Sequence, residues 1–562
     1  MMAPRWSTAC PDWEARIVEG RPLVPFSPLF PDEADAALEI LRSLRIVDAA
    51  GSPTIDESCR QWVFDFAAAI FGAYDARIGR RLIRNFFQLV AKKNSKSTIA
   101  AAIMLTALMR NWRKSAEFLI LAPTIEVANN SFGPARDMIA ADEELKDILH
   151  VQANIRTITH RNTGATLKVV AADNETVSGK KAVGVLIDEL WLFGKRANAE
   201  NMLREATGGL ASRPEGFVIY LSTQSDEPPA GIFRQKLNEF RDIRDGKVVD
   251  RKSLGVIYEF PKALIDSKGY LDPENFYISN PNLGASVDKE FLIDGLTTAQ
   301  RNGPQSLCGF AAKHLNVEIG LALRSDRWTG AEYWEACADH ELTLDAILER
   351  SEVVTVGIDG GGLDDLLGLA VMGRDKDTRE WLLWTHAWAH NSVLERRKEI
   401  VPALQDFERD GDLTVVEYVG QDVEDVADIV ERIELAGLLP EKVAIGVDQM
   451  GISEIVDALG QRNIAIEKIG GVPQGWKLNN AIKTTERKLA GGTLKHCGTR
   501  MMDWCLGNAR AEPKGNAVTI SKQISGSAKI DPLMATFDAV VAMGLNPEST
   551  RSVYEDRDLL IL

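Results

Sequence analysis

The sequence has few cysteines, no long apolar run and no signal peptide. Six cysteines occur in 562 residues, without a CxxC pair or a spacing typical of zinc ligands. We therefore expect reduced thiols rather than disulfides or a zinc cluster. The apolar stretch Ile99–Leu105 is far shorter than the roughly 18–20 residues that cross a bilayer. The first 20 residues lack an apolar signal core. These absences predict a cytoplasmic protein without a membrane partner.

Basic charge is also in the minority. There are 81 Asp and Glu against 65 Lys and Arg, which gives a net charge of −16. This excess argues against a protein that simply coats nucleic acid, because such proteins are expected to be basic. One stretch, 76–114, contains ten Lys or Arg and no acid. It is either a solvated basic face or a local patch for a nucleotide, a neighbouring subunit or DNA.

The chain is too long for a single hydrophobic core, because such cores stop growing near roughly 250–300 residues. Short apolar strands alternate with amphipathic stretches, which predicts an α/β fold with a parallel sheet in the first half. The strands predicted in the first half are Asn85–Val90, Glu117–Ala122, Thr166–Ala171, Val183–Asp188 and Phe217–Thr223. Those predicted in the second half are Glu352–Asp359, Glu380–Trp384, Leu413–Val419, Val443–Asp448 and Ile464–Ile469, before an apolar helix that follows Ile530.

This pattern divides the chain into five predicted segments. They are an N-terminal extension or small cap over 1–55, a first domain over 56–325, a linker over 326–350, a second domain over 351–547 and a C-terminal tail over 548–562.

A candidate phosphate loop lies between the first strand and a predicted helix, Lys96–Arg110. Its sequence is Ala91-Lys92-Lys93-Asn94-Ser95-Lys96-Ser97. A phosphate loop needs backbone N–H groups around the phosphates, a lysine and a hydroxyl for Mg²⁺, and Lys96 and Ser97 supply the last two. The general pattern has glycine at positions 90 and 95, where this chain has Val90 and Ser95. Serine at 95 restricts the backbone, since glycine reaches positive φ more readily.

Two later strand ends favour the same interpretation. Val185-Leu186-Ile187-Asp188-Glu189 is an apolar strand that ends in two acids. In an ATPase, Asp188 would hold Mg²⁺ through water, and Glu189 would orient and deprotonate the attacking water. The next strand ends in Leu221-Ser222-Thr223-Gln224, where a polar sensor of the γ-phosphate is expected.

Three carboxylates in the second half suggest a nuclease site. Asp359 and Asp448 end strands, and Asp531 opens an apolar helix. Cleavage of a phosphodiester by two metal ions needs several oxygen ligands from separate elements, which can converge at one sheet edge. Asp365 is a possible fourth acid. Asp538 lies on the same helix face as Asp531, about 10 Å further along, and is an alternative third ligand.

The sequence resembles the large subunit of tailed-bacteriophage terminases. The resemblance rests on an ordered set of motifs spread over roughly 58–545. They are AKKNSKS (91–97), VLIDEL (185–190), STQ (222–224), SNPNLG (279–284), KHLNVE (313–318), VGIDGGGLDDL (356–366) and KIDPLMATFDAVVAM (529–543). The family's usual phosphate loop reads Ala-Arg-Lys-Asn-Gly-Lys-Ser or -Thr, so Lys92 and Ser95 depart from it.

The resemblance implies a P-loop NTPase domain of the additional-strand type, followed by an RNase H-like α/β nuclease domain. It implies ATP-driven translocation of double-stranded viral DNA and Mg²⁺- or Mn²⁺-dependent cutting of concatemers. The expected partners are the portal protein, the small terminase subunit and further copies of the chain in a ring. The expected location is the host cell cytoplasm and, transiently, the procapsid.

The resemblance also assigns roles to individual residues. Thr223 would couple hydrolysis to DNA movement, Glu189 would be the acid/base, and Arg204 or Arg213 would serve a neighbour as an arginine finger. The residues implied at the nucleotide are Lys93, Asn94, Ser95, Lys96, Ser97, Thr98, Asp188 and Thr223, with Ser97 and Asp188 at Mg²⁺. Those implied at the nuclease metals are Asp359, Asp365, Asp448 and Asp531.

Three alternatives remain open at the level of sequence. One is a helicase-like DNA translocase whose second domain does not cut. Another is a transposase- or resolvase-like nuclease with a degenerate ATPase domain, which Ser95 favours. A non-enzymatic capsid or scaffold role would require both acid constellations to be coincidental.

Overall fold

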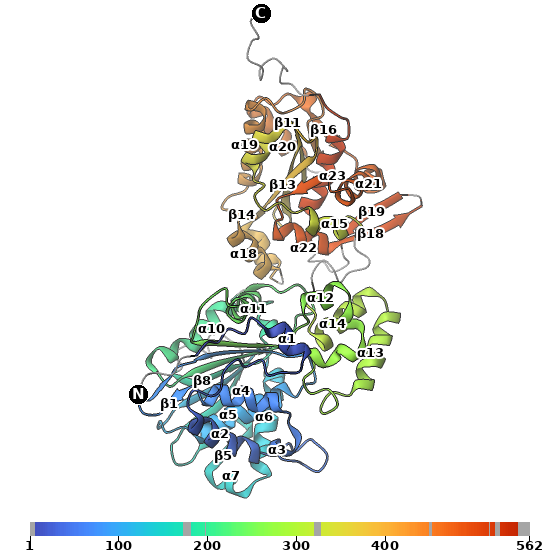
Figure 1. The fold of residues 1–562 in the computed structure, drawn as a ribbon. Coiled ribbons are helices and arrows are strands. Elements are labelled where there is room, and N and C mark those ends of the chain that lie inside the picture. Colours follow the sequence, from blue (N-terminus) through green and yellow to red (C-terminus); the bar gives the residue numbers. More distant parts are fainter. Residues whose placement is uncertain are drawn as a thin grey trace, which may run out of the picture. The chain divides into compact units, whose positions relative to one another are not determined.

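The computed structural model describes residues 6–171, 181–196, 198–319, 328–398, 400–448, 452–515, 517–522 and 529–548. The chain forms two compact units, Met1–Ile319 and Gly320–Leu562, each with its own central sheet (Figure 1). No helix in the described ranges is both long and apolar enough to cross a membrane.

An eight-stranded sheet forms the centre of the first unit. Its spatial order is β10-β3-β9-β8-β4-β7-β6-β5. The strands are β3 (Asn85–Leu89), β4 (Glu117–Ala122), β5 (Leu149–Gln152), β6 (Thr157–His160), β7 (Thr166–Ala171), β8 (Ala182–Ile187), β9 (Phe217–Ser222) and β10 (Ser253–Ile257). The sheet is parallel from β10 to β7, whereas β6 and β5 are antiparallel additions at one edge. The five predicted strands are confirmed, and β9 lies between β3 and β8, as the additional-strand type requires.

Helices cover both faces of this sheet. Figure 1 shows α4 and α5 on one face and α10 and α11 on the other. The helices are α1 (Trp13–Val18), α2 (Pro31–Ser43), α3 (Ile55–Ser58), α4 (Gln61–Phe71), α5 (Lys96–Met109), α6 (Ile125–Ala140), α7 (Glu143–Ile148), α9 (Leu190–Phe193), α10 (Ala199–Gly208), α11 (Gly231–Arg244), α12 (Lys262–Asp266), α13 (Lys289–Arg301) and α14 (Pro304–Leu315). A small hairpin joins β1 (Tyr74–Asp75) to β2 (Arg80–Arg81). Helix α5 is apolar all round and almost wholly buried, as expected for a helix between a sheet and further helices.

A mixed seven-stranded sheet forms the centre of the second unit. Its order is β14-β13-β12-β11-β15-β16, and β17 also pairs with β13. The strands are β11 (Ser351–Gly360), β12 (Leu366–Asp375), β13 (Trp381–His390), β14 (Leu413–Val416), β15 (Ile445–Asp448), β16 (Ile469–Val472) and β17 (Leu494–His496). Three antiparallel strands, β11 to β13, are followed by β15 and β16, which run parallel to β11. This is the mixed α/β sheet expected of an RNase H-like domain.

Helices and a hairpin complete the second unit. The helices are α15 (Ala331–Trp334), α16 (Leu344–Arg350), α17 (Asn391–Arg396), α18 (Val401–Asp410), α19 (Gln421–Leu435), α20 (Ile452–Gln461), α21 (Asn479–Ala490), α22 (Arg500–Asn508) and α23 (Asp531–Met543), and the hairpin joins β18 (Ala509–Lys514) to β19 (Ala517–Lys522). Helix α23 packs against β11, β12 and β15.

The predicted linker differs from the structure. Trp328 and Trp334 are fully buried in the core of the second unit, and Ile347 is buried in a second cluster of the same unit. Residues 328–350 are therefore part of this folded unit, because large apolar side chains drive them into its core. Residues 326–327 of that segment and 549–562 of the predicted tail lie outside the described residues.

Strand β16 begins where the predicted strand Ile464–Ile469 ends. The paired residues include Gly470 and Gly471, and glycine has a low β-propensity that hides such a strand from sequence analysis.

Candidate nucleotide and nuclease sites

The phosphate loop connects β3 to α5 and contains two residues with left-handed backbone. Lys93 has φ 75° and Ser95 has φ 55°. Ser95 thus adopts the conformation for which the family pattern has glycine, at a cost of roughly 1 kcal/mol for a residue with a β-carbon. Lys96 is the first residue of α5, so the positive end of the helix dipole and its unpaired N–H groups point toward this loop.

A network of asparagines braces the loop from behind. The Asn94 amide is buried and donates to the Ala91 carbonyl (3.0 Å) and to Asn280 Oδ1 (2.8 Å). Asn282 N–H donates to Asn94 Oδ1 (3.0 Å), and Asn282 Nδ2 donates to the Asn94 carbonyl (3.1 Å). The side chain of Asn94 therefore holds the loop rather than facing outward. Sequence analysis identified the SNPNLG segment (279–284) only as a motif and missed this bracing function.

The lysine, the hydroxyl and the two acids predicted for an ATPase come together at the end of β8. Lys96 Nζ donates to Glu189 Oε1 (2.6 Å), and Ser97 Oγ donates to Asp188 Oδ2 (3.2 Å). Ser131 Oγ also donates to Asp188 Oδ2 (2.9 Å). Thr98, in the first turn of α5, is half-buried. A cation suited to phosphate and a hydroxyl–carboxylate pair suited to Mg²⁺ thus lie within one set of contacts.

Burial and the neighbouring charges shift the pKa values of these groups. Burial raises the pKa of Asp188 despite the nearby Lys96 ammonium. For Glu189, burial alone would raise the pKa, but Lys96 and the Trp191 indole N–H outweigh it and the net pKa is lowered. Glu189 is therefore a carboxylate held by a cation, and it becomes a stronger base whenever Lys96 moves to another anion.

Both oxygens of Glu189 have partners. Lys96 binds Oε1, and Trp191 Nε1 donates to Oε2 (2.6 Å). Glu189 itself has a left-handed backbone, with φ 53°. Because its backbone is strained and both of its carboxylate oxygens are hydrogen-bonded, the Glu189 side chain has one defined orientation.

Thr223 follows β9 directly and is buried. Its carbonyl accepts from Ser222 Oγ (2.7 Å), and that hydroxyl accepts from Trp191 N–H (3.0 Å). The carbonyl of Ser222 accepts from Val90 N–H (3.1 Å) at the start of the phosphate loop. The end of β9 thus contacts both the phosphate loop and the segment after Glu189.

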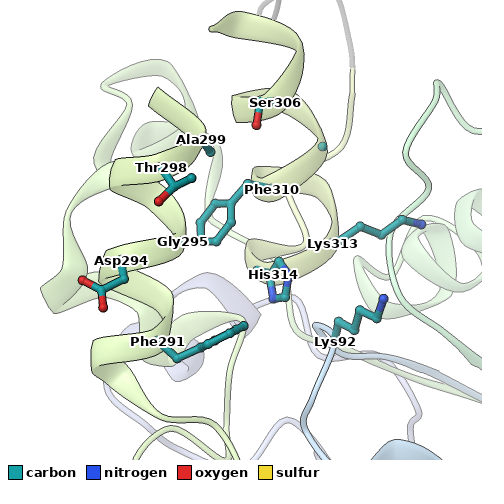
Figure 2. A pocket seen from close by; sticks show the side chains of 11 residues that line it. Lys92, Phe291, Asp294, Gly295, Thr298, Ala299, Ser306, Phe310, Lys313 and His314 are labelled. Carbon is teal, nitrogen blue, oxygen red and sulfur yellow. The ribbon is translucent and has the colours of Figure 1, made fainter. Parts of the chain in front are cut away.

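A cavity of about 460 Å³ lies beside the loop, between α13 and α14. Figure 2 shows Phe310 between the two helices, with His314 and Lys313 also on α14 and Lys92 at the edge of the loop. The His314 ring stacks on Phe310. Burial, opposed mainly by Asp226 and Glu189, lowers the pKa of Lys313 to about 7. This cavity was not anticipated from the sequence.

The two arginines proposed as fingers differ in exposure. Arg204 is exposed on α10 and donates to Asn201 Oδ1 (2.7 Å). Arg213 is half-buried in the turn before β9, and its carbonyl accepts from Arg84. Only an exposed guanidinium can reach a neighbouring subunit without rearrangement, which favours Arg204.

In the second unit, Asp359 is the second-last residue of β11, and Asp448 is the last residue of the neighbouring parallel strand β15. Ile358 pairs with Val447, so the two acids that follow are also neighbours. Each lies two residues after a glycine whose missing β-carbon faces α23: Gly357 in β11 and Gly446 in β15. Because side chains alternate along a strand, both acids face α23.

Helix α23 brings a third acid to this place. A β-carbon at Gly446 would lie 2.6 Å from the carbonyl oxygen of Asp538. Burial and the Asp359 carboxylate, with a smaller contribution from Asp448, raise the pKa of Asp538 to about 9, although Gln474 donates to it. Asp538 is thus a helix acid that is electrostatically coupled to both strand acids.

Asp531 and Asp365 lie close by. Asp531 is buried at the start of α23, and its Oδ1 would be 3.2 Å from a β-carbon on Gly360. Asp365 forms an ion pair with the buried Lys529. Within the described ranges, no three acid, histidine or cysteine side chains are already arranged as a metal site. Binding a metal here would therefore require the acidic side chains to reorient.

Two family profiles agree with this organisation. A family profile described as terminase large subunit, ATPase domain, matches residues 62–229, and one described as terminase large subunit, endonuclease domain, matches residues 256–545, more than half of the chain. Protein YmfN of Escherichia coli (strain K12) is 23% identical over 315 residues, which cover 54% of this chain and 66% of that protein, just under two thirds. The crystal structure of the HK97 bacteriophage large terminase is 19% identical, with 91% of this chain and 99% of that chain covered and a TM-score of 0.46. A large terminase from a thermophilic bacteriophage, in complex with ADP, is 11% identical, with 82% of this chain and 93% of that chain covered and a TM-score of 0.28.

Proposed function

This chain belongs to the terminase large-subunit family, and from that premise we propose that it packages viral DNA. It hydrolyses ATP to move double-stranded DNA into a procapsid and cuts concatemeric DNA with a metal-dependent endonuclease. The observation that carries the proposal is the contact of Lys96 with Glu189 and of Ser97 with Asp188 in the first unit. The second unit has a separate set of acids. Each unit thus has the groups for one of the two reactions.

In the ATPase unit, the chain supplies four distinct groups. Lys96 binds the phosphates of ATP, and the backbone of the loop from Lys93 to Thr98 surrounds them. Glu189 positions the attacking water and accepts a proton from that water once Lys96 has left Glu189 for the phosphates. Ser97 and Asp188 fit Mg²⁺, which would neutralise charge on the phosphates. Thr223, between the loop and Glu189, communicates phosphate loss to the rest of the unit.

In the nuclease unit, Asp359, Asp448 and Asp538 would hold divalent metal, with Asp531 adjacent. The donor set is all oxygen, as Mg²⁺ and Mn²⁺ prefer. Metal bound there would activate water and stabilise charge on the cleaved phosphodiester. Asp365 forms an ion pair with Lys529. Its carboxylate therefore positions this ammonium, and it would have to leave the ion pair in order to bind a metal.

The partners we propose follow from the family. They are double-stranded DNA, the portal protein, the small terminase subunit and other copies of the chain in a ring, with Arg204 reaching the neighbour's nucleotide. The protein would act in the host cytoplasm and on the procapsid. A negative net charge suits a motor that must release the DNA backbone at every step, because many phosphate contacts bind tightly and with steep salt dependence.

A plasmid-cleavage assay with ATP hydrolysis followed in the same tubes tests this function. We expect Lys96→Ala to abolish ATP turnover but not cleavage, and Asp359→Ala to do the reverse, with Mg²⁺ or Mn²⁺ present. ATP turnover without cleavage in either metal would favour a translocase without nuclease activity. Cleavage without turnover would favour a nuclease with a silent ATPase unit, for which the strained Ser95 is the structural reason.

A further inference from the structure

Helix α14 ends against three parts of the ATPase site at once. The carbonyl of Lys313 accepts from Lys92 N–H in the phosphate loop (2.8 Å). Lys313 Nζ donates to the Gln224 carbonyl (3.0 Å), and Asn316 Oδ1 accepts from Gln224 N–H (3.1 Å), so the residue after Thr223 is held from both sides. The last turn of α14 and the residue after it are therefore hydrogen-bonded to both the phosphate loop and the end of β9.

The third contact is with Trp191. Lys313 Nζ lies 2.9 Å from the centre of the indole ring, and the N–H of the same ring donates to Glu189 Oε2. A cation over an aromatic face is attracted by the ring, more strongly where water is excluded. With a pKa of about 7, Lys313 carries this charge below neutral pH and loses it above. Lys313 thus contacts the Trp191 ring, and the N–H of that ring binds the Glu189 carboxylate.

We propose that Lys313 is a positioning residue for ATP hydrolysis, which acts on Glu189 through the indole of Trp191. The proposal rests on the proposed function and extends it by naming the route from the end of β9 to the base. When Lys96 turns to the phosphates, Trp191 still donates to Glu189, and Lys313 fixes the plane of its ring. Figure 2 shows the side chains of Lys313 and Lys92 extending in the same direction, away from α13.

A second lysine provides a matched control. Lys195 Nζ also lies near the Trp191 ring, but at 5.2 Å. It forms ion pairs with Asp226 (2.8 Å) and Glu227 (3.3 Å). Its charge is therefore paired locally with two carboxylates, and it lies 2.3 Å farther from the ring centre than Lys313 does (5.2 against 2.9 Å).

The test measures kcat and KM for ATP, and binding of a fluorescent ATP analogue, in the full chain. Trp191→Phe keeps the ring but removes the N–H, and Lys313→Met keeps the stem but removes the charge. We expect each to lower kcat about 10- to 100-fold, with KM within about twofold, and the double variant to be no slower than the slower single one. Lys313→Arg should recover most of the activity, and Lys195→Met should stay within about twofold of wild type.

Several outcomes would overturn the proposal. They are an unchanged kcat in Lys313→Met, losses that multiply in the double variant, or a higher KM with normal kcat. If Lys313→Met melts at a lower temperature than wild type, Lys313→Gln takes its place under the same criteria. A wild-type chain without ATP turnover, whose nuclease is active, would overturn the proposed ATPase function and this inference together. Normal wild-type turnover with an unaffected Lys313→Met would overturn this inference alone.

Discussion

Ser95 shows the energetic cost of placing a residue with a β-carbon in a left-handed backbone conformation. Its φ of 55° lies in the left-handed region, which glycine enters without a β-carbon penalty. We expect Ser95→Gly to raise the free energy of unfolding of the first unit by about 0.5–1 kcal/mol, less the extra freedom of glycine in the unfolded chain. ATP turnover should be equal or faster. Thermal unfolding and steady-state ATPase assays measure both, with Ser95→Ala as control. A lower melting temperature for Ser95→Gly would show that the hydroxyl matters more than the backbone.

Asp538 is the residue on which the nuclease assignment most depends. With a pKa raised to about 9, it is protonated at pH 7 until a metal or another cation favours its ionised form. We expect Asp538→Asn to abolish cleavage without loss of stability in EDTA, because the amide replaces a carboxyl that is already neutral. Mg²⁺ should raise the melting temperature of the wild-type second unit at pH 8, but not that of Asp538→Asn. Calorimetry with and without EDTA measures this, and Asp531→Asn tests the alternative ligand in parallel.

At the scale of elements, the approach of α23 to its sheet decides where the acids lie. A β-carbon at Gly357 would overlap the backbone of Ala535, and one at Gly368 would lie 2.6 Å from the carbonyl carbon of Asp531. We expect Gly357→Ala to cost about 2–3 kcal/mol of stability in the second unit, since the helix must move away. Cleavage should be lost while ATP turnover persists. Gly460→Ala on α20, with open space around it, is the control and should leave both activities intact.

The same elements show what sequence analysis recovers. Five strands of the first unit were predicted, because buried parallel strands are short apolar runs bounded by turns, whereas β5, β6 and β10 were missed. Strand β12 was missed although Leu366–Asp375 is buried along its whole length, since Gly368 and Gly373 interrupt its apolar run and glycine has a low β-propensity. The acids at strand ends could be identified by residue type. The coupling of Asp538 to Asp359 could not, because it depends on glycines in other strands that allow α23 to come close.

Contacts between segments that are distant in the sequence could not be predicted either. Asn94 pairs with Asn280 and Asn282 across nearly 190 residues, and Lys313 reaches Trp191 from another part of the chain. No local pattern marks such pairs, since a polar residue in a turn has the same sequence signal whether or not it meets a partner. The predicted linker failed for a related reason: buried Trp328 and Trp334 pack against elements more than a hundred residues away.

At the scale of the whole molecule, buried histidines predict sensitivity to acid. Burial lowers the pKa of His314, His386 and His496 to about 4 in the folded chain, against about 6.5 when unfolded. Their contribution to stability is complete above pH 6.5 and is lost as the pH falls toward 4, at about 1–3 kcal/mol each. Asp503 and Asp538, whose pKa values burial raises to about 7 and about 9, act in the opposite direction. Each lowers the free energy of unfolding as the pH rises from about 4 to its folded pKa.

Urea unfolding between pH 4 and 8 measures this balance. Between pH 6.5 and 4 the free energy of unfolding is set by the difference between these opposed contributions, and His386→Gln should raise it at pH 4 relative to pH 8, in the second unit only. An unchanged difference between wild type and His386→Gln across this pH range would mean that the His386 imidazole remains hydrated in the folded chain.

The ion pair between Lys96 and Glu189 has a consequence for affinity. In the nucleotide-free chain Lys96, the residue proposed to bind ATP, already forms an ion pair with Glu189. Part of the free energy of ATP binding is therefore used to separate Lys96 from Glu189. A glutamine at 189 holds the ammonium less tightly, and we expect Glu189→Gln to bind ATP several-fold more tightly than wild type while failing to hydrolyse it. Titration with a fluorescent nucleotide measures the difference. On the proposed roles, nucleotide that draws Lys96 away would free the Glu189 carboxylate to act as the base, so the chain would become competent for hydrolysis only once ATP is bound.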